Sequence, residues 1–598
     1  MIQLITNTNS AIQSPHYELG SIQDVVDYCS AAQVLGVDTE TEGFDFTCKK
    51  MIMFQIGDEH QQFVIDTRFI SIEPLRKILE SKKIIKILHN AKFDYKFIKQ
   101  TSNIELECVY DTFLTERVLN CGKDGVRYGL KDVCKKYLNV ELNKEIRNQF
   151  IGLSGQPYKN DQIIYGAKDV EYLIGIRNYQ LPLIEQFKLQ NVVDLENKAV
   201  LAFADIEYNG LDIDKESWEV IAKKSEEEAL EMAESLDNII LTNKNFSNFI
   251  AKAVQTDLFT PMSEIRKVNV KWSSPKQVLE VFKKLATSYG KDFFKFVSSD
   301  GKIHTNFNQI LDTGRVASSK PNMQQIPANN TFRNCFVAPE GDCFVSSDYS
   351  SQELNVIAFG SKDPVWIDAL QKGQDLHSVC AELVYGTKWN DVAEDNCHFL
   401  SNRRKCNCPK HKILRTNVKT INFGLAYGMG PHKLADTLDI SMKEAGDLIN
   451  TYFEAFPKIG GFLNKLGDYG KKFGYIKTFP PYSRRRWFSN WYPRINSNRS
   501  EAFELGSIER ASKNTPIQGA SADMTKRALI LMRSHIKEFN LPVKLVMTVH
   551  DQIDTICSID YAPDWVRLMT ELMENAALEI VTNGLLKADT NISKSWEK

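Results

Sequence analysis

Residues 415–428 read RTNVKTINFGLAYG, and this stretch is the strongest indication of the architecture of the chain. If the stretch is a helix, positions four apart lie on nearly the same face, because each residue turns the chain by about 100°. One such face carries two cations followed by two aromatic rings: Arg415, Lys419, Phe423 and Tyr427. An amphipathic core helix explains the rings but not the cations on the same face. A nucleotide with its phosphates on the cations and its base on the rings explains both.

Two acidic residues end strand-like runs on either side of this helix. Asp348 follows the apolar run CFVSS, and Asp551 lies where VMTVHDQID turns and continues as QIDTICS. Each acid taken alone could be an unrelated surface group. The runs at 342–350 and 543–559 enclose a long helical middle, so we expect one sheet that is interrupted by inserted helices.

Together these segments resemble the DNA polymerases of family A, which are DNA polymerase I-like, and the resemblance covers nearly the whole chain. It implies that Asp348 and Asp551 hold two Mg²⁺ (or Mn²⁺) ions, which position the primer 3′-hydroxyl and the α-phosphate for in-line attack. The implied partners are primer–template DNA and dNTPs. A processivity factor or other replisome proteins are further expected partners.

The resemblance also assigns the side chains that bind the nucleotide and the DNA. Arg415 and Lys419, together with His377 in GQDLHS, match residues that neutralise the triphosphate. The rings of the stripe match the groups that stack on the incoming nucleotide. Glu353 matches the glutamate whose bulk excludes a ribose 2′-hydroxyl, which implies deoxynucleotides. The residues that are expected to contact DNA are Arg315, Asn322, Gln324, Arg510, Asn514, Gln518 and His550.

Two positions near the acids depart from the pattern of the family. Gln552 follows Asp551 where the family usually has a glutamate, and Asn355 stands where it usually has an arginine. The two aspartates can still hold the ions, so we expect activity and leave the metal preference open. Asn355 removes one expected ion pair.

A second acidic constellation lies near the N-terminus. Asp38 and Glu40 end the apolar strand of AQVLGVDTE at i and i+2, so both side chains leave the same face and can share a hard cation. A lone Asp-x-Glu is more often a solvated strand end. HNAKFDYKF adds Asp94, however, and YGAKD adds Tyr165 and Asp169 one helical turn apart.

These residues, in this order, resemble the 3′→5′ exonucleases of the four-carboxylate type with a tyrosine. The resemblance implies that the four acids hold two metal ions around the scissile phosphate, with one ion activating water. It implies that Tyr165 orients the attacking water. We therefore expect an active proofreading nuclease.

The expected fold is an α/β exonuclease domain, ribonuclease H-like, followed by an α+β polymerase right hand. The expected bounds are 1–190 for the exonuclease domain and 191–598 for the polymerase domain, with the thumb at about 195–305, the palm at about 306–360 and 505–598, and the fingers at about 361–504. The thumb is short, which predicts low intrinsic processivity or an accessory clamp. This compact layout, without a 5′-nuclease domain, resembles bacteriophage replicative polymerases.

Composition limits the function classes without choosing one. The chain has 598 residues with 43% apolar and 25% charged residues, and it carries neither a signal peptide nor a membrane span, so we expect it in the cytoplasm, of a host cell if it is viral. The net charge of −2 leaves DNA binding to local clusters. Two basic runs exist, at 484–486 and 403–405, and solvated surface is the better interpretation of either one alone. The 12 cysteines fit reduced thiols.

One insertion remains, NCHFLSNRRKCNCPKHK at 396–412. Cys397, Cys406, Cys408 and His411, with His398 as an alternative ligand, suit a structural Zn²⁺. The Cys-x-Cys spacing is tighter than usual, so chance clustering of reduced cysteines is an equal alternative. A short polar insertion cannot bury a core, which favours the metal slightly.

Two other functions stay open. The chain could be a stand-alone exonuclease whose C-terminal half only binds nucleic acid, or a non-catalytic structural protein of a replication or packaging complex. Extension and excision assays with Mg²⁺ separate the three.

Overall fold

The computed structural model describes most of the chain, namely residues 1–7, 14–142, 145–153, 156–224, 227–228, 231, 291–326, 330–395, 397–491 and 499–597. Contacts divide it into two compact units. The first comprises Met1–Gly210, Thr305–Gln324 and Gly341–Ser593, and the second comprises Leu211–His304, Gln325–Glu340 and Lys594–Lys598. Most of the predicted thumb, including its expected shortness, lies outside the described residues.

The N-terminal part of the first unit is built on a seven-stranded sheet with the order β2-β1-β5-β4-β3-β6-β7. Its strands are β1 (Ile2–Ile5), β2 (Glu18–Leu19), β3 (Val34–Thr41), β4 (Met51–Gly57), β5 (Gln62–Asp66), β6 (Ile85–Leu88) and β7 (Val109–Asp111). The predicted apolar strand of AQVLGVDTE is confirmed as β3. All residues of β4 and β5 are buried, because helices and loops cover both faces.

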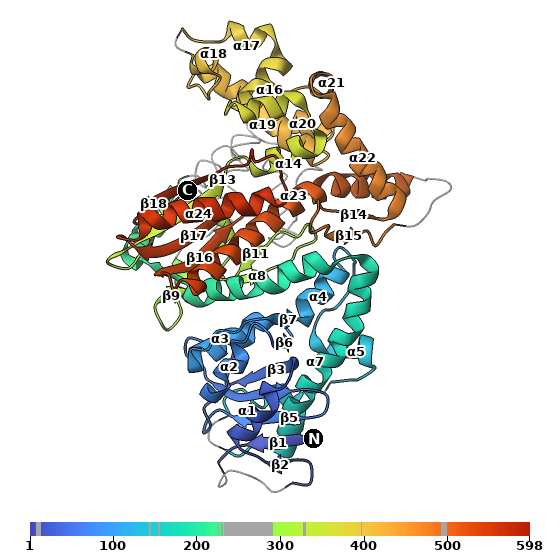
Figure 1. The fold of residues 1–598 in the computed structure, drawn as a ribbon. Coiled ribbons are helices and arrows are strands. Elements are labelled where there is room, and N and C mark those ends of the chain that lie inside the picture. The colour runs from blue at the N-terminus through green and yellow to red at the C-terminus, as the bar shows by residue number, and fades with distance from the viewer. Residues whose placement is uncertain are drawn as a thin grey trace, which may run out of the picture. The chain divides into compact units, whose positions relative to one another are not determined.

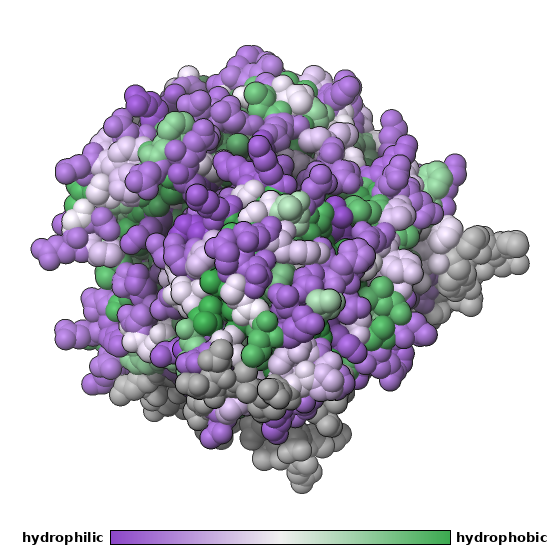
Figure 2. Space-filling model, turned by 60° about the horizontal axis from the view of Figure 1, so that its bottom comes forward, coloured by the Kyte–Doolittle hydropathy of each residue, from purple (hydrophilic) through white to green (hydrophobic). Residues whose placement is uncertain are grey.

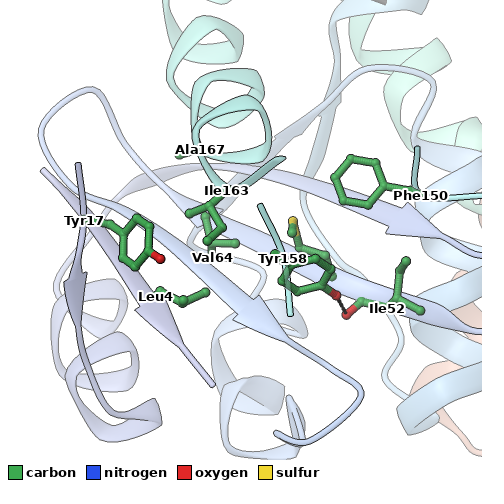
Figure 3. Packing of buried hydrophobic residues seen from close by; sticks show 9 residues of the cluster. Leu4, Tyr17, Ile52, Val64, Phe150, Tyr158, Ile163 and Ala167 are labelled. Carbon is green, nitrogen blue, oxygen red and sulfur yellow. Dashed lines mark hydrogen bonds between the residues drawn. The ribbon is translucent and has the colours of Figure 1, made fainter. Parts of the chain in front are cut away.

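Helices complete this part of the unit. They are α1 (Ile22–Ser30), α2 (Arg76–Leu79) after the short turn η2 (Glu73–Leu75), α3 (Ala91–Ser102), α4 (Thr112–Leu119), α5 (Leu130–Leu138), α6 (Glu145–Asn148) and α7 (Asn160–Phe187). The segment IIKILHNAKFDYKFI changes from strand β6 to helix α3. Figure 3 shows Ile163 and Ala167 of α7 above the apolar residues of the sheet, where the Tyr158 hydroxyl donates to the Ile52 carbonyl oxygen at 2.7 Å.

Two glycines allow α7 to approach the sheet closely. A Cβ atom added to Gly36 of β3 would lie 2.6 Å from the carbonyl oxygen of Val170, and one added to Gly166 would lie 2.6 Å from Gln55 Nε2. Contacts this short are not tolerated in folded proteins, so a side chain at Gly36 would push the helix away. The helix and β3 carry predicted exonuclease acids, and the glycines set their separation.

The helix α8 (Gln190–Asn209) follows and is enclosed by α3, α4, α23 and β16. Its buried acids are paired. Asp205 accepts from Lys99 Nζ at 2.8 Å and from Arg533 Nε at 2.7 Å, and Glu207 is paired with Lys92 and Lys96. Burial alone would raise the pKa of Asp205, but the two cations lower it to about 2. The helix therefore buries charge only where partners from other elements meet it.

The second large sheet of the first unit is antiparallel, with the order β16-β17-β13-β18. Its strands are β13 (Asp342–Tyr349), β16 (Val543–Val549), β17 (Gln552–Ser558) and β18 (Ala588–Ser593). The helices α23 (Arg499–Glu538) and α24 (Ala562–Leu578) pack together and against it (Figure 1). The prediction of one sheet interrupted by inserted helices is confirmed.

The inserted segment between β13 and β16 is mainly helical. It contains α14 (Gln352–Ser361), α15 (Pro364–Gln371), α16 (Leu376–Tyr385), α17 (Thr387–Asp391), α18 (His398–Asn402), α19 (Pro409–Ala426), α20 (Pro431–Leu438), α21 (Met442–Ala455), α22 (Pro457–Phe473) and the hairpin β14 (Tyr475–Lys477) with β15 (Arg485–Trp487). The helix α19 packs against α16 and α20, and it contains the predicted stripe of cations and rings.

The smaller elements complete the two units. In the first unit, β10 (Asn306–Asn308) pairs with β11 (Ala317–Ser319). The short turn η4 (Met323–Gln325) lies at the boundary between the two units. The second unit contains the sheet of β8 (Leu211–Ile213), β9 (Lys302–Ile303) and β12 (Phe336–Val337), with the turn η3 (Lys291–Phe296) and the short helix α13 (Asn330–Arg333). Its core is aromatic, since the buried Trp218 ring packs on Phe293 at 4.3 Å and on Phe332 at 5.2 Å.

The interpretation of the basic run at 484–486 as solvated surface is wrong for Arg484. This side chain is 0% exposed and lies between Glu196 of α8 and Asp523 of α23, with 2.5 Å between its guanidinium and Asp523 Oδ1. Lys526 Nζ contacts the same Glu196 at 2.6 Å. A charge run on a sequence cannot reveal acids from distant segments, and these acids are what make the burial possible.

The described surface is otherwise ordinary. On the face in Figure 2, hydrophilic residues predominate and the apolar ones form small separate patches. None of the helices in the described ranges combines the length and the apolar character that a membrane span requires. All 12 cysteines are described, and all are free thiols.

Candidate active sites

The two acids that flank the inserted helices meet at one edge of the second sheet. Asp348 lies near the end of β13 and pairs across the ladder with Gln552, the first residue of β17. Asp551 precedes Gln552 in the tight turn from β16, where His550 adopts a left-handed φ of 59°. The Thr548 hydroxyl closes the turn by donating to the Gln552 carbonyl oxygen at 2.9 Å. The antiparallel pairing therefore brings both predicted metal-binding aspartates to the same place.

A pocket of about 220 Å³ opens beside this turn. Six of the predicted site residues line it: Arg315, Gln324, Glu353, Phe423, His550 and Asp551. They come from β10–β11 and its following loop, from α14, from α19 and from the β16–β17 turn. Segments that are far apart in the sequence thus converge on one cavity, which is the usual form of a small-molecule site.

Glu353 is held from two sides at this pocket. It forms an ion pair with Arg315 and accepts a hydrogen bond from the Tyr427 hydroxyl. Burial raises the pKa of Glu353, and Arg315 opposes part of that rise. These contacts fix the position of the Glu353 side chain next to the cavity.

The cationic end of α19 contacts α16. Arg415 donates from Nε and from a terminal guanidinium nitrogen to the two oxygens of Asp375, at 2.6 and 2.7 Å. Burial would raise the pKa of Asp375, but hydrogen bonds from Arg415 and Ser378 lower it. Burial and the nearby Arg415 lower the pKa of His377 to about 4, so its ring is neutral at pH 7. His377 is therefore an uncharged ring beside Arg415, and Lys419 on α19 is exposed.

The predicted DNA-contacting residues are spread over two regions. Near the pocket, Ser318 donates to Asn322 Oδ1 at 3.0 Å, and Gln324 donates to the Thr548 carbonyl oxygen at 3.3 Å. On α23, Arg510, Asn514 and Gln518 follow one another at intervals of four and share a face. The Arg510 side chain packs against Gly428, directly after the stripe on α19. The buried Asn514 Oδ1 has no hydrogen-bond partner among the described residues.

Three of the four predicted exonuclease acids come together. Asp38 and Glu40 of β3 and Asp169 of α7 each place a carboxylate oxygen within 4.8 Å of the others. The fourth acid, Asp94 of α3, is not part of this group. Its Oδ1 accepts a hydrogen bond of 2.6 Å from Thr39, the residue between the two strand acids. The sequence did not point to Thr39, because a threonine within a strand carries no functional signal.

Tyr165 lies on α7 one turn before Asp169. Its ring packs on Phe150 with 6.4 Å between the ring centroids, at the margin of the cluster of Figure 3. Another acid that the sequence analysis missed is Asp111, which is 1% exposed and accepts from the backbone N–H groups at the start of α3 and α4. Asp375 was also missed, although an acid before the apolar run of α16 is a recognisable N-cap signal.

Two family descriptions match the chain. Residues 210–598 match "DNA polymerase family A", and residues 20–185 match "3'-5' exonuclease". The first match covers more than half of the 598 residues. The chain belongs to DNA polymerase family A. It joins a 3′-5′ exonuclease domain to a polymerase domain of that family.

Relatives of this family A polymerase are bacterial proteins named DNA polymerase I. It is 25% identical to that of Borreliella burgdorferi over 96% of this chain and 63% of the relative, and 26% identical to that of Aquifex aeolicus over 94% and 96%. The Bacillus caldotenax protein is 29% identical over 68% of this chain and 46% of the relative. The chain thus spans about half to two thirds of the length of most of the curated relatives it matches.

A solved structure has the same fold. It is described as the "POL domain of Pol1 from M. smegmatis complex with DNA primer-template and dNTP". The match has a TM-score of 0.78 and 24% identity, and it covers 100% of this chain and 99% of the other. The expected fold class, an exonuclease domain followed by a family A polymerase domain, is confirmed.

The structure gives physical reasons for both departures of this family A polymerase from the family pattern. Gln552 Nε2 donates to Asp554 Oδ1 at 2.6 Å, and the two side chains are buried. A glutamate at Gln552 would set a second negative charge against Asp554. Asn355 donates to the carbonyl oxygens of Ser350 and Ser351, both at 3.2 Å, and so supports the turn into α14.

Proposed function

We propose that this chain is a template-directed DNA polymerase with 3′→5′ proofreading exonuclease activity, which acts on primer–template DNA with dNTPs. The observation that carries the proposal is the 220 Å³ pocket that joins Asp551, Glu353 and Phe423. Each of the three has a distinct task in nucleotide transfer, and they come from three separate segments. Membership of family A supports the same conclusion.

The donor set at the polymerase site fits divalent ions. Asp348 and Asp551 offer hard carboxylate oxygens at one sheet edge, which suit Mg²⁺ or Mn²⁺. Such ions, when bound, would activate the primer 3′-hydroxyl and stabilise the charge on the transferred phosphate. Phe423 offers a face for the base of the dNTP. Glu353, fixed by its contacts to Arg315 and Tyr427, excludes a ribose 2′-hydroxyl.

Residues of α19 and α16 bind the negatively charged triphosphate. Arg415 and Lys419 lie one turn apart on α19 and neutralise the phosphates, and His377 adds a hydrogen bond. The bidentate contact with Asp375 holds the Arg415 guanidinium in one orientation before the nucleotide arrives. Arg315, Asn322, Gln324 and His550 near the pocket, and Arg510, Asn514 and Gln518 on α23, then contact the DNA.

The exonuclease site also fits divalent ions. The oxygens of Asp38, Glu40 and Asp169 converge within 4.8 Å, and carboxylate oxygens are the ligands that Mg²⁺ and Mn²⁺ prefer. Ions held there, with Asp94 as the fourth acid, would activate water toward the terminal phosphodiester. Tyr165, one turn from Asp169 and braced by Phe150, orients that water.

The remaining expectations belong to the same proposal. The exonuclease domain is 1–190 and the polymerase domain 191–598, with the palm at 306–360 and 505–598, the fingers at 361–504 and the thumb at 195–305. The sheet of β13, β16, β17 and β18 supports the palm bounds. A processivity factor, a cytoplasmic location and a phage-like genome stay predictions.

Extension and excision by the purified full chain with Mg²⁺ test the proposal. Asp551→Ala should abolish extension of a primed template and leave excision, whereas Asp38→Ala with Glu40→Ala should do the reverse. Asp560→Ala, in the exposed turn after β17, is a matched control and should change neither activity. Excision without extension would leave the stand-alone exonuclease, and the absence of both would leave the structural protein. Loss of both activities in a folded Asp551→Ala variant would contradict independent sites.

A further inference from the structure

The insertion at 396–412 buries its sulfur and nitrogen ligands although most of its side chains face solvent. The exposed fractions are 4% for Cys397, 6% for Cys406, 4% for Cys408 and 1% for His411. Most of the residues between them are exposed. The segment has few apolar side chains of its own. Phe399 and the neighbouring Trp389 pack beside the cluster, but apolar packing does not require that three thiols and an imidazole be buried together.

The ligand atoms converge on one centre. The three Sγ atoms and a nitrogen of His411 lie within 4.8 Å of one another. His411 Nδ1 is 3.4 Å from Cys397 Sγ and 3.2 Å from Cys406 Sγ. In a tetrahedral site with a metal–sulfur distance of about 2.3 Å and a metal–nitrogen distance of about 2.1 Å, sulfur and nitrogen are about 3.6 Å apart. The observed separations are close to that value.

The other side of the imidazole is already held. His411 Nε2 lies 2.7 Å from the carbonyl oxygen of Trp389, which can only accept, so Nε2 carries the proton. Nδ1 therefore presents its lone pair to the thiols. The Trp389 ring stacks on the imidazole at 3.8 Å with an angle of 6° between the planes, which fixes the ring orientation. A metal-binding histidine typically has such a backbone acceptor behind it.

The thiols of Cys397 and Cys406 both face the lone pair of His411 Nδ1, and a bound ion explains this arrangement better than hydrogen bonds do. A neutral imidazole nitrogen accepts one hydrogen bond along its lone pair, so His411 Nδ1 can accept from only one of Cys397 and Cys406 at a time, and the other thiol is left with a neighbouring cysteine as its partner. A disulfide does not resolve this arrangement, because all three cysteines of the cluster are free thiols. Three thiolates and one imidazole around a single ion satisfy every group at once.

We propose that Cys397, Cys406, Cys408 and His411 bind one structural Zn²⁺. Three sulfurs and one nitrogen match the preference of Zn²⁺ for tetrahedral coordination, and four protein ligands leave no position for a substrate. The site therefore stabilises structure and performs no chemistry. This part of the inference does not depend on the polymerase function.

The position of the site gives it a role. Cys408 is the N-cap of α19, the helix that begins at Pro409 and carries the stripe of cations and rings. Between the ligands, Arg403 forms two hydrogen bonds of 2.8 and 2.6 Å with Glu382 of α16, and its carbonyl oxygen accepts from the Asp375 backbone N–H at 2.9 Å. Figure 1 shows α16, α17, α18 and α19 gathered at one end of the inserted segment.

The zinc thus fixes the segment before α19, and Arg403 of that segment contacts α16. These helices carry Arg415 and His377, which bind the triphosphate in the proposed function, and this role rests on that function. Without the ion, residues 397–408 would lose the cross-link that orders them. Arg415 and Lys419 would then become ordered only when the nucleotide binds. The cost would appear as weaker dNTP binding, with the exonuclease unaffected.

Metal analysis of the full chain, purified without added metal, should find about one zinc per chain. The double variant Cys406→Ser with Cys408→Ser should contain about tenfold less zinc. Cys380→Ser is the matched control, since Cys380 is a buried thiol of α16 outside the cluster, and it should keep its zinc. The proposed site would be refuted by a wild-type chain without zinc or by a double variant that retains its zinc. It would also be refuted if the control variant lost as much zinc as the double variant.

Cobalt gives a readout that needs no variant. Wild-type chain in which Co²⁺ replaces the zinc should show the intense visible bands of tetrahedral cobalt and the ultraviolet bands of thiolate ligation. Spectra of octahedral cobalt without thiolate bands would contradict the proposed ligand set.

Activity separates the role of the site from the proposed function. The double variant should keep excision and show a KM for dNTP about tenfold higher. An unchanged KM would refute the bracing role while the metal analysis still decides the site. If the wild-type chain fails to extend primers but contains one zinc, the polymerase proposal fails and the zinc site stands.

Discussion

Arg484→Met is the most informative single substitution for the stability of the first unit. It keeps most of the side-chain volume and removes the charge from a position that is 0% exposed. Asp523 then loses its contacts of 3.2 Å to Nε and 2.5 Å to a terminal nitrogen, and keeps the Thr478 hydroxyl at 3.4 Å. Glu196 keeps Lys526 at 2.6 Å. The unbalanced charge therefore lies on Asp523.

The size of the effect follows from proton binding. Burial already raises the pKa of Asp523 above 3.8, and Arg484 opposes that rise. Without Arg484 the buried carboxyl takes up a proton, and at about 1.4 kcal/mol per pH unit the cost at pH 7 is at most about 4 kcal/mol. The folded variant then binds more protons than the unfolded chain, so its stability falls as pH rises. The penalty should shrink to about 1.5 kcal/mol at pH 5.

Urea unfolding followed by tryptophan fluorescence at pH 5, 6 and 7 measures this dependence. The control is Arg485→Met, because Arg485 stacks on the Tyr475 and Trp487 rings at 4.4 and 4.8 Å and forms no ion pair with a carboxylate of the described residues. Its cost should be about 1 kcal/mol and independent of pH. A penalty for Arg484→Met that is the same at pH 5 and pH 7 would refute the reasoning, and so would one as small as that of the control.

Three further predictions concern the two candidate active sites. Glu353→Ala should raise the ratio of kcat/KM for ribonucleotides over deoxynucleotides by at least about tenfold, about 1.4 kcal/mol, and an unchanged ratio would mean that another residue excludes the hydroxyl. Thr39→Val should slow excision by about tenfold by releasing the α3 carboxylate, whereas Thr41→Val on the same strand should not. Gly36→Ala should abolish excision and spare extension, because the added methyl group would collide with α7. Gly446→Ala, where the added methyl group has open space, is the control and should change neither activity. If Gly36→Ala and the wild type excise at equal rates, the close approach of α7 is not needed for excision.

The sequence carried the local features of both sites. The apolar runs that form β3, β13 and β16 end at or just before acids. Strand ends can be recognised in a sequence because buried strands consist of short apolar or alternating runs. The stripe on α19 was visible for the same reason, since four-residue spacing lies within one helix. The resemblance to family A then supplied the order of the segments, and the family match confirmed the membership of the family.

Only the folded chain revealed which of these groups meet. The contacts of Glu353 with Arg315 and Tyr427, the hydrogen bond of Asp94 to Thr39 and the burial of Arg484 depend on segments that are distant in sequence. No periodicity reports a partner from another element. The cysteine cluster is the clearest case, because its irregular spacing left zinc and chance equal, and the convergence of its buried atoms within 4.8 Å favours zinc. Spacing records where residues lie along the chain, whereas coordination and ion pairing depend on distances that tertiary packing sets.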